Sequence, residues 1–171
     1  VYKRQYQTRL FSKASGEGAQ VIRCGRVSAN LFSTLGVAPA LGRNFTADEE
    51  QPGHRVVILS HDLWVSMFGS SPDAIGQTVK ISDLPYTIVG VMPAGLHYAT
   101  GEPGLFWSTF AIDAEGPEPR TSVRDEDRIA VLGRLKPGVS IDQALADLNT
   151  IQRNLAQHYA EDRLRPAVSI Q

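Results

Sequence analysis

Residues 77–92 read QTVKISDLPYTIVGVM, and this stretch decides the fold class. Two alternating or apolar runs, Gln77 to Ser82 and Tyr86 to Met92, lie on either side of Asp83-Leu84-Pro85. Strand-like runs around a short break of this kind predict an antiparallel hairpin.

A second hairpin-like connection is predicted near the N-terminal end. Tyr2 to Phe11 and Gln20 to Val27 have strand-like alternation, and Ser12 to Gly18 between them reads as a loop or hairpin connection rich in Gly and Ser. Two such connections, with helices mixed among the strands, favour an α+β fold with a mixed or antiparallel sheet over a parallel doubly wound sheet.

Further strands are predicted from short apolar runs. Val56 to Leu59 is fully apolar, which is typical of a buried strand. Leu105 to Phe110 predicts a short strand, and Ile129 to Leu135 predicts a strand that ends at the Pro137-Gly138 turn. Ala167 to Ile170 is typical of the start of another strand.

Capping residues mark two helices. Ser28 is a good N-cap for a short helix that ends at Gly36, and Ser60 is a good N-cap for a helix that ends at Gly69. An apolar stripe on the second helix predicts its buried face. The stripe consists of Leu63, Trp64, Met67 and Phe68.

Capping boxes mark two more helical segments. Thr46 and Glu49 have the required spacing for a segment of about one turn. Ser140 and Gln143 begin a longer helix that runs to about Tyr159, with apolar residues at helical spacing along one face.

The composition is that of an ordinary globular protein. The 171 residues predict one domain, with two small subdomains as the alternative. Because 17 basic residues nearly cancel 18 acidic ones, we expect no nucleic-acid partner. The chain contains no run of about 18 apolar residues, which a membrane span would need. It begins at Val1, and we expect it to be a piece of a longer protein.

Ser60-His61-Asp62 brings the three residue types of a hydrolase triad into one run. Consecutive helical residues point about 100° apart. They therefore cannot form the nucleophile–base–orienter arrangement, whose members come from separate parts of a fold. We interpret the run as a helix N-terminus, where Asp62 is favoured by the macrodipole.

No metal site is predicted. The four histidines, His54, His61, His97 and His158, share no metal-ligand spacing. A site built from His54 and His61 with Asp48 nearby is an alternative, but its spacing matches no familiar motif. His158 is expected on a solvated helix face.

The acidic clusters Asp48-Glu49-Glu50 and Asp125-Glu126-Asp127 are interpreted as solvated loop residues, because a glycosidase pair needs opposed carboxylates across a cleft. Gly16 and Gly18 lack the context of a nucleotide-binding fingerprint. The single cysteine, Cys24, lies in an alternating stretch and is predicted to be a small core residue. We therefore expect no catalytic, cofactor-binding or metal-binding residue, and no enzyme.

An ordered series of segments carries a more specific signal. The segments are Val27 to Phe32 with Leu35-Gly36-Val37, Pro39-Ala40 and Leu41 to Phe45; Val56 to Ser60 with Leu63-Trp64 and Phe68-Gly69; Ile75 to Val79; Tyr86 to Pro93; and Leu132 to Val139 with Ser140, Ala144 and Leu148. As a set they resemble the MacB-like periplasmic core domain of ABC-transporter permeases of the FtsX/LolE/MacB type, from about Val21 to Tyr159. Two segments depart from the family pattern. Ser82 to Pro85 lacks the usual turn glycine, and Phe106 to Phe110 replaces Leu-Trp-x-Pro-Leu.

The resemblance implies a non-catalytic domain on the extracytoplasmic face of the bacterial inner membrane, anchored by transmembrane helices. Its implied role is to transmit conformational change from the membrane and ATPase parts to a periplasmic adaptor or substrate protein, in efflux or in lipoprotein or lipid transport. The implied partners include a second permease subunit and, through the membrane helices, a cytoplasmic ATPase.

Two other functions remain as alternatives. A periplasmic ligand-binding or sensor module would need an apolar pocket, and Trp107, Tyr98 and the segment from Pro93 to Arg128 are its candidate lining. A hydrolase built on His61 or His54 is the third possibility.

Overall fold

The computed structural model describes residues 5–15, 18–81, 84–96, 105–111 and 130–158. The strands are β1 (Gln5–Ser15), β2 (Gly18–Val27), β3 (Leu41–Gly42), β4 (Val56–Leu59), β5 (Thr78–Ile81), β6 (Leu84–Val91), β7 (Leu105–Thr109) and β8 (Ala130–Val131). The helices are α1 (Leu31–Leu35), α2 (His61–Phe68) and α3 (Ile141–His158), with short 3₁₀ turns η1 (Ala47–Glu50) and η2 (Pro72–Ala74). In the part of the chain that the structure describes, no helix has both the length and the apolar character of a membrane span.

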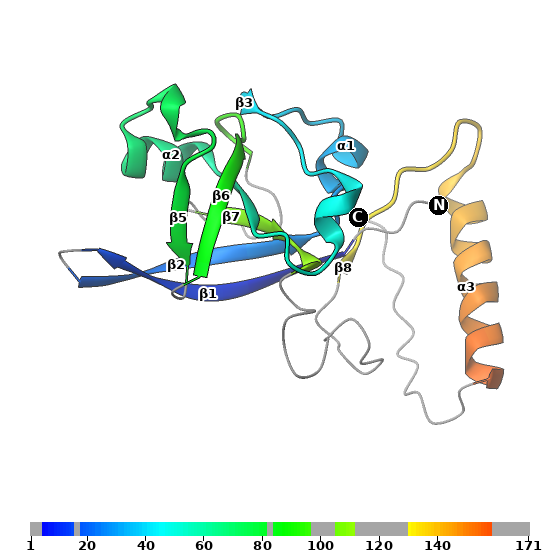
Figure 1. Cartoon of the computed structure of the whole chain (residues 1–171). Helices are drawn as coiled ribbons and strands as arrows, with labels where there is room; N and C mark the ends of the chain where they lie inside the picture. Colours follow the sequence, from blue (N-terminus) through cyan, green and yellow to red (C-terminus); the bar gives the residue numbers. More distant parts are fainter. Residues whose placement is uncertain (1–4, 16–17, 82–83, 97–104, 112–129, 159–171) are drawn as a thin grey trace.

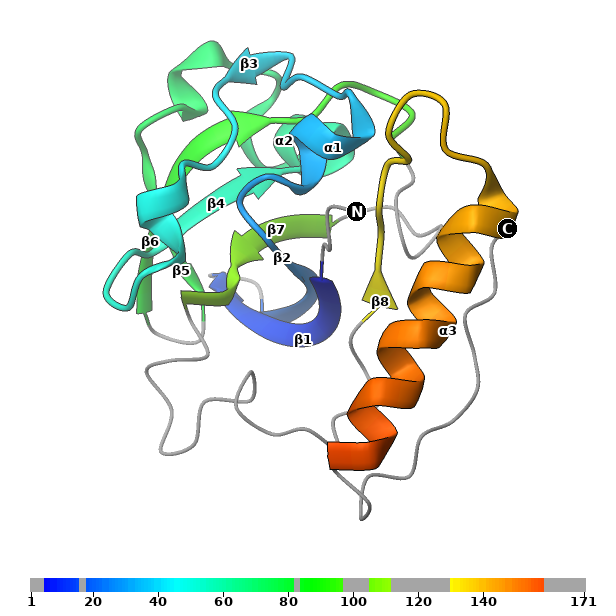
Figure 2. The ribbon, with the colours of Figure 1, turned by 90° about the vertical axis from the view of Figure 1, so that its right-hand side faces the viewer.

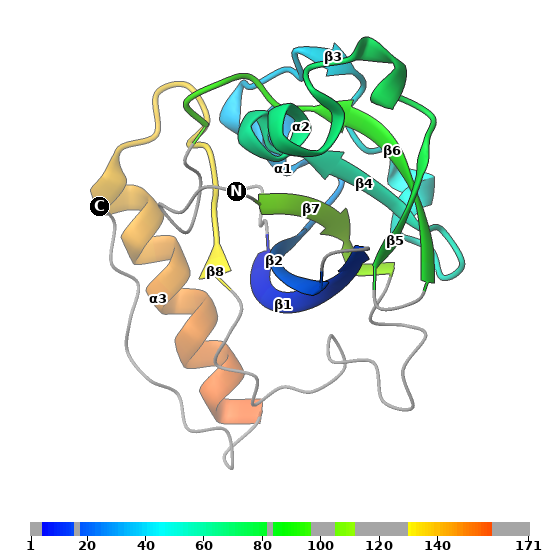
Figure 3. The same ribbon diagram turned by 90° about the vertical axis from the view of Figure 1, so that its left-hand side faces the viewer.

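The strands form one mixed sheet in the order β3-β6-β4-β7-β2-β1-β8, with β5 also paired to β6. β2 and β7 are parallel, as are β4 and β6, and the other pairs are antiparallel. β1 also lies close to β5, so the sheet curls strongly, as Figures 2 and 3 show. The predicted α+β fold with a mixed sheet is confirmed.

Around β4 and β6 both faces of the sheet are covered, because α1 and α2 lie on opposite sides of this part (Figure 1). β4 shows the consequence: Val57 and Leu59 contribute to the core on the α2 side, whereas Ile58 contributes to the core on the α1 side. The predicted buried strand at Val56 to Leu59 is therefore confirmed. A strand that is apolar on both faces is what a sheet between two layers requires.

The core on the α2 side contains the stripe predicted from sequence. Leu63 is buried, and Trp64, Met67 and Phe68 pack against this core. The single cysteine, Cys24, is fully buried in it, as predicted. The Trp64 indole N–H also donates to the Ser71 carbonyl at 2.8 Å, which fixes the chain just after α2.

The core on the α1 side is built around two aromatic rings. Phe32 and Trp107 meet edge to face, with ring centroids 5.3 Å apart and an interplanar angle of 84°. Gly25 of β2 lies against the indole, because a Cβ at this position would lie only 2.6 Å from Cδ1 of Trp107. The absence of a side chain at Gly25 is what makes room for Trp107 between β2 and α1.

Several boundaries differ from the predicted ones. Ser12 to Ser15, predicted as part of a loop, belong to β1, because the cross-strand register continues to the pair Ser15 and Gly18. Leu84 and Pro85, predicted in the turn, belong to β6, where Pro85 faces Lys80. Local composition suggested loops at both places, but pairing with the neighbouring strand extends through these polar and proline positions.

Two other predictions were also wrong in detail. Ser28 is not the N-cap of α1, because the cap position is Asn30, which makes no side-chain capping bond. Ile129 lies outside the described residues; of the rest of the strand predicted to Leu135, Ala130 and Val131 form β8, and beyond them Leu132 packs against the α1-side core. By contrast, Gly36 and Gly69 end their helices as predicted, and both adopt the left-handed conformation. The region from Ala167 to Ile170 lies outside the described residues.

Candidate functional site

The Ser60-His61-Asp62 run lies at the start of α2, as predicted. Ser60 Oγ accepts a hydrogen bond from the Leu63 amide at 3.3 Å, which is the geometry of a helix N-cap. The Nδ1 atom of His61 lies 3.8 Å from Oδ1 of Asp62, and its ring meets Trp64 edge to face. The Ser60 hydroxyl therefore caps a helix in this structure and is not aligned as a nucleophile.

The structure does not bring together the other residues considered as metal ligands or catalytic groups. His54 is exposed in the segment after η1, whereas His61 begins α2. Among the described residues, no three His, Cys, Asp or Glu side chains are grouped closely enough to hold a metal ion. His97, the side chain of His158 and the cluster Asp125 to Asp127 lie outside what the structure describes.

Trp107, a candidate lining residue for a ligand pocket, is only 1% exposed and packs inside the α1-side core. Its ring faces Phe32 and Gly25. Tyr98, the other candidate, lies outside the described residues. Trp107 is therefore a core residue and does not line a ligand pocket.

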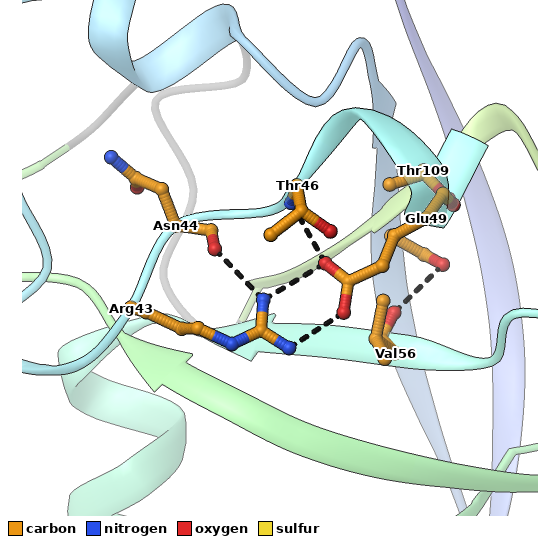
Figure 4. Close-up of polar contacts among 7 residues, drawn as sticks. Arg43, Asn44, Thr46, Glu49, Val56 and Thr109 are labelled. Atoms are coloured by element: carbon orange, nitrogen blue, oxygen red, sulfur yellow. Dashed lines mark hydrogen bonds and ion pairs between the residues drawn. The ribbon is translucent and has the colours of Figure 1, made fainter.

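One acidic residue departs from its prediction. Glu49 is buried, with 6% of its surface exposed, and is not a solvated loop residue. Its carboxylate accepts two hydrogen bonds from the Arg43 guanidinium, at 2.9 Å from Nη1 and 2.6 Å from Nη2 (Figure 4). A two-bond contact between planar groups fixes both the distance and the orientation of the partners. The sequence did not reveal this pair because its members are six residues apart, outside any helical spacing.

The carboxylate of Glu49 also closes the N-terminus of η1. It accepts from the Thr46 amide at 2.9 Å, as the predicted capping box requires. Burial by itself would raise the pKa of Glu49. The hydrogen bonds from Arg43 and Thr46 outweigh that effect, and the pKa is lowered below its ordinary value. Glu49 is thus held as the anion, and the same contact raises the pKa of Arg43.

Further bonds connect η1 to the sheet and to α1. The Thr109 hydroxyl, fully buried at the end of β7, donates to the Glu49 carbonyl at 2.6 Å (Figure 4). Glu50, next in the chain, accepts from the Ala29 amide at 2.6 Å, just before α1. We call these contacts of Arg43, Glu49, Glu50 and Thr109 the η1 node. The node joins η1 to the segments that follow β2 and β3 and to the last residue of β7.

A second polar contact connects α1 to the segment before α3. Arg134 donates to the Thr34 carbonyl from Nε at 3.0 Å and from Nη2 at 2.8 Å. Thr34 lies in the last turn of α1, where carbonyl groups lack helical partners and a cation is favourable. The contact links residues a hundred positions apart, and no local sequence pattern could have indicated it.

Together these contacts make a site that holds segments in place. The groups of the η1 node are satisfied by one another, and its one buried carboxylate is neutralised by Arg43. Such a site stabilises a fixed arrangement of strands, helices and connections. The site therefore has a structural role. The two hydrogen bonds from Arg134 to the Thr34 carbonyl similarly connect the segment before α3 to α1.

Comparison with known proteins gives a consistent picture. The family model for the MacB-like periplasmic core domain matches residues 3–151 of the chain. A probable syringafactin export ATP-binding/permease protein of Pseudomonas syringae pv. syringae is 32% identical over 65 residues, which is 38% of this chain. The chain spans about a tenth of that relative, because the match covers 10% of it.

Two solved structures share the fold. The periplasmic region of MacB from Actinobacillus actinomycetemcomitans has a TM-score of 0.67 at 13% identity, over 94% of this chain and 68% of that one. The extracellular domain of the ABC-type transporter YknZ from Gram-positive bacteria has a TM-score of 0.66 at 18% identity, over 95% of this chain and 78% of that one. At these identities the likeness concerns the fold alone.

Proposed function

Because the chain belongs to the family of MacB-like periplasmic core domains, we propose that it transmits conformational change within an ABC-transporter permease. In this role the domain lies on the extracytoplasmic side of the inner membrane and is anchored by membrane helices of its parent protein. ATP hydrolysis belongs to another part of the transporter, and this domain performs no chemical step.

The observation that carries the mechanical part of the proposal is the double core. β4 is buried between two layers, and the η1 node ties η1 to β7 and to the start of α1. Close-packed layers with satisfied polar contacts move as one body, because packed interiors have low compressibility. A displacement applied at the membrane end would therefore reach a partner at the far end with little loss.

We further propose a protein as the contact of this domain, either a periplasmic adaptor or a substrate protein, with a second permease subunit beside it. The cytoplasmic ATPase acts through the membrane helices. An exported molecule is favoured as cargo over lipoprotein or lipid, because the relative that matches at 32% identity is named an export protein.

The location is tested in the full-length gene product with the single substitution Val65→Cys, since Val65 is 41% exposed on α2. A membrane-impermeant maleimide should label this variant in intact spheroplasts. The parent protein provides the background, because Cys24 is buried and should react slowly. Labelling of the Val65→Cys variant only after the membrane is permeabilised would contradict the extracytoplasmic location.

The mechanical role is tested by loosening the η1 node in the same protein. The pair Glu49→Gln and Thr109→Val should lower transport while basal ATP hydrolysis and membrane insertion are retained, because the nucleotide site is elsewhere. The control Thr109→Ser keeps the hydroxyl and should transport normally. Normal coupling of transport to ATP hydrolysis in a variant with a measurably loosened domain would argue against rigid-body transmission.

A further inference from the structure

Three exposed apolar side chains lie close together before and at the start of α3. Leu135 is 38% exposed, Val139 36% and Ile141 51%, all within seven residues. Among the side chains whose exposure the structure describes, the other large hydrophobic ones this exposed are Val65, Leu84 and Ile151. We call the segment from Leu135 to Ile141 the tip. Figure 2 shows it in the loop that passes from β8 to α3.

The tip is an ordered structure. Its turn is closed by a hydrogen bond from the Val139 amide to the Lys136 carbonyl at 3.1 Å. After the turn, Ser140 and Gln143 cap α3 reciprocally, at 2.9 Å and 3.2 Å. Before it, Arg134 holds the chain on the Thr34 carbonyl. The apolar side chains are therefore held in solvent by a defined backbone.

The described part of the domain does not supply a cover for these side chains. Leu132 packs against the α1-side core, but neither core includes a described residue of α3 or of the tip. Within α3, Ala144 is buried whereas Ile151 is 44% exposed. Leu132 thus packs against the core, whereas the next three large apolar residues, Leu135, Val139 and Ile141, are exposed.

The charge of the tip restricts the kind of partner. Between Ala130 and Ile141 the ionisable residues are Arg134 and Lys136, and one exposed carboxylate, Asp142, follows in the first turn of α3. Exposed apolar side chains beside two cations and one carboxylate, with a net positive charge, fit a surface that is apolar inside and anionic outside. The interface of an anionic phospholipid bilayer has this composition.

The position of the tip agrees with this match. Gln5, where β1 begins, pairs with Val131, four residues before Leu135. If the segment before β1 leads to the membrane, as the proposed function holds, this end of the sheet is the end nearest the bilayer. This step of the argument rests on the proposed function, whereas the exposure and the charge of the tip do not.

We propose that the tip inserts Leu135, Val139 and Ile141 into the interface of an anionic phospholipid bilayer, with Lys136 at the level of the headgroups. The contact fixes the height and orientation of the domain on the membrane. Apolar insertion and attraction of one or two cations each add to a weak, reversible association.

The experiment is flotation of the 171-residue chain with vesicles of phosphatidylglycerol and phosphatidylethanolamine, and with vesicles of phosphatidylcholine alone. The chain should bind the anionic vesicles and bind the neutral ones more weakly, and added salt should reduce the difference. The triple variant Leu135→Ser, Val139→Ser, Ile141→Ser should lower the partition coefficient roughly tenfold, because most of the inserted apolar area is removed.

A matched control is available. Val65→Ser with Leu84→Ser removes apolar side chains that are 41% and 38% exposed on α2 and β6. This control should bind as the parent chain does. Circular dichroism melts establish that both variants are folded. Lys136→Gln should weaken binding to anionic vesicles and leave binding to neutral ones unchanged.

A second measurement does not depend on loss of binding. An environment-sensitive fluorophore on Val139→Cys should shift to the blue with anionic vesicles, and one on Val65→Cys should not. Absence of binding, or equal loss in the triple variant and the control, overturns the proposal. Cross-linking of the tip to another protein in the full-length permease, together with absence of vesicle binding, would also overturn the proposal and would identify a protein as the partner. Cytoplasmic location of the domain would contradict the proposed function but would not alter the vesicle result.

Discussion

The Arg43 guanidinium and the Glu49 carboxylate make two hydrogen bonds, yet their side chains differ greatly in exposure, at 50% for Arg43 and 8% for Glu49. Loss of one partner therefore has unequal consequences. An unpaired Arg43 can be hydrated, whereas an unpaired Glu49 remains a buried anion.

We expect Arg43→Met to lower the free energy of unfolding by about 2–3 kcal/mol, and Glu49→Gln by about 1–2 kcal/mol. Urea denaturation of both single variants and the double variant measures the two effects and their coupling. The double variant should be more stable than the sum of the single effects predicts, because each single change already breaks the pair. Equal effects of the two substitutions, or full additivity, would show that exposure does not govern this contact.

The pH dependence of stability follows from the lowered pKa of Glu49. The unfolded chain has a pKa near the reference value of 4.5, and the folded protein has a lower one. The contribution of Glu49 is therefore fully present above 4.5 and is lost as the pH falls through the lower folded value. The stability difference between the parent chain and Glu49→Gln should be constant near neutral pH and shrink in acid. Denaturation curves at several pH values test this, with Thr109→Val as a variant whose effect should not depend on the ionisation of Glu49.

The Thr109 hydroxyl has a defined, testable contribution. It is fully buried and donates to the Glu49 carbonyl, so Thr109→Val keeps the shape but leaves that carbonyl without this donor. We expect a loss of about 1–2 kcal/mol in the free energy of unfolding. Thr109→Ser, which keeps the donor, should lose less. Hydrogen exchange of the η1 amides should be faster in Thr109→Val alone, and equal rates in the two variants would contradict the assigned role.

Gly25 provides a test of the α1-side core. In Gly25→Ala the new methyl group would meet Cδ1 of Trp107, so the indole or β2 must shift. Overpacking of this kind should cost about 1–3 kcal/mol. Gly25→Ala should cost less stability in a Trp107→Phe background than in the parent chain, because the smaller ring leaves room for the methyl group. If Gly25→Ala is equally harmful with either ring, the close approach is not the cause.

The sequence predicted the features that depend on neighbouring residues. Apolar β4, the Ser60 and Ser140 caps and the buried Cys24 each follow from a few positions and from general preferences. The predicted boundaries were wrong where pairing decided them, as at Pro85 in β6.

The site was predicted less completely than the fold. The Thr46 and Glu49 capping box was predicted, but the burial of Glu49 and its contact with Arg43 were not. A carboxylate is normally solvated, and the group that compensates its burial lies across a turn. The link between Thr109 and Glu49 joins residues sixty positions apart, which only the folded chain brings together.

The place of β7 in the sheet has a consequence for the order in which the molecule can assemble. β7 lies between β2 and β4, so among the described strands the backbone pairing that links the β1–β2 hairpin to β3, β4, β5 and β6 runs through residues 105–109. While the chain emerges from a ribosome or a translocation pore, two half-sheets with open inner edges must persist until this short strand arrives. Because contacts between distant segments form slowly, we expect the docking of β7 to limit the folding rate and the open edges before it to be the stage most prone to misassembly.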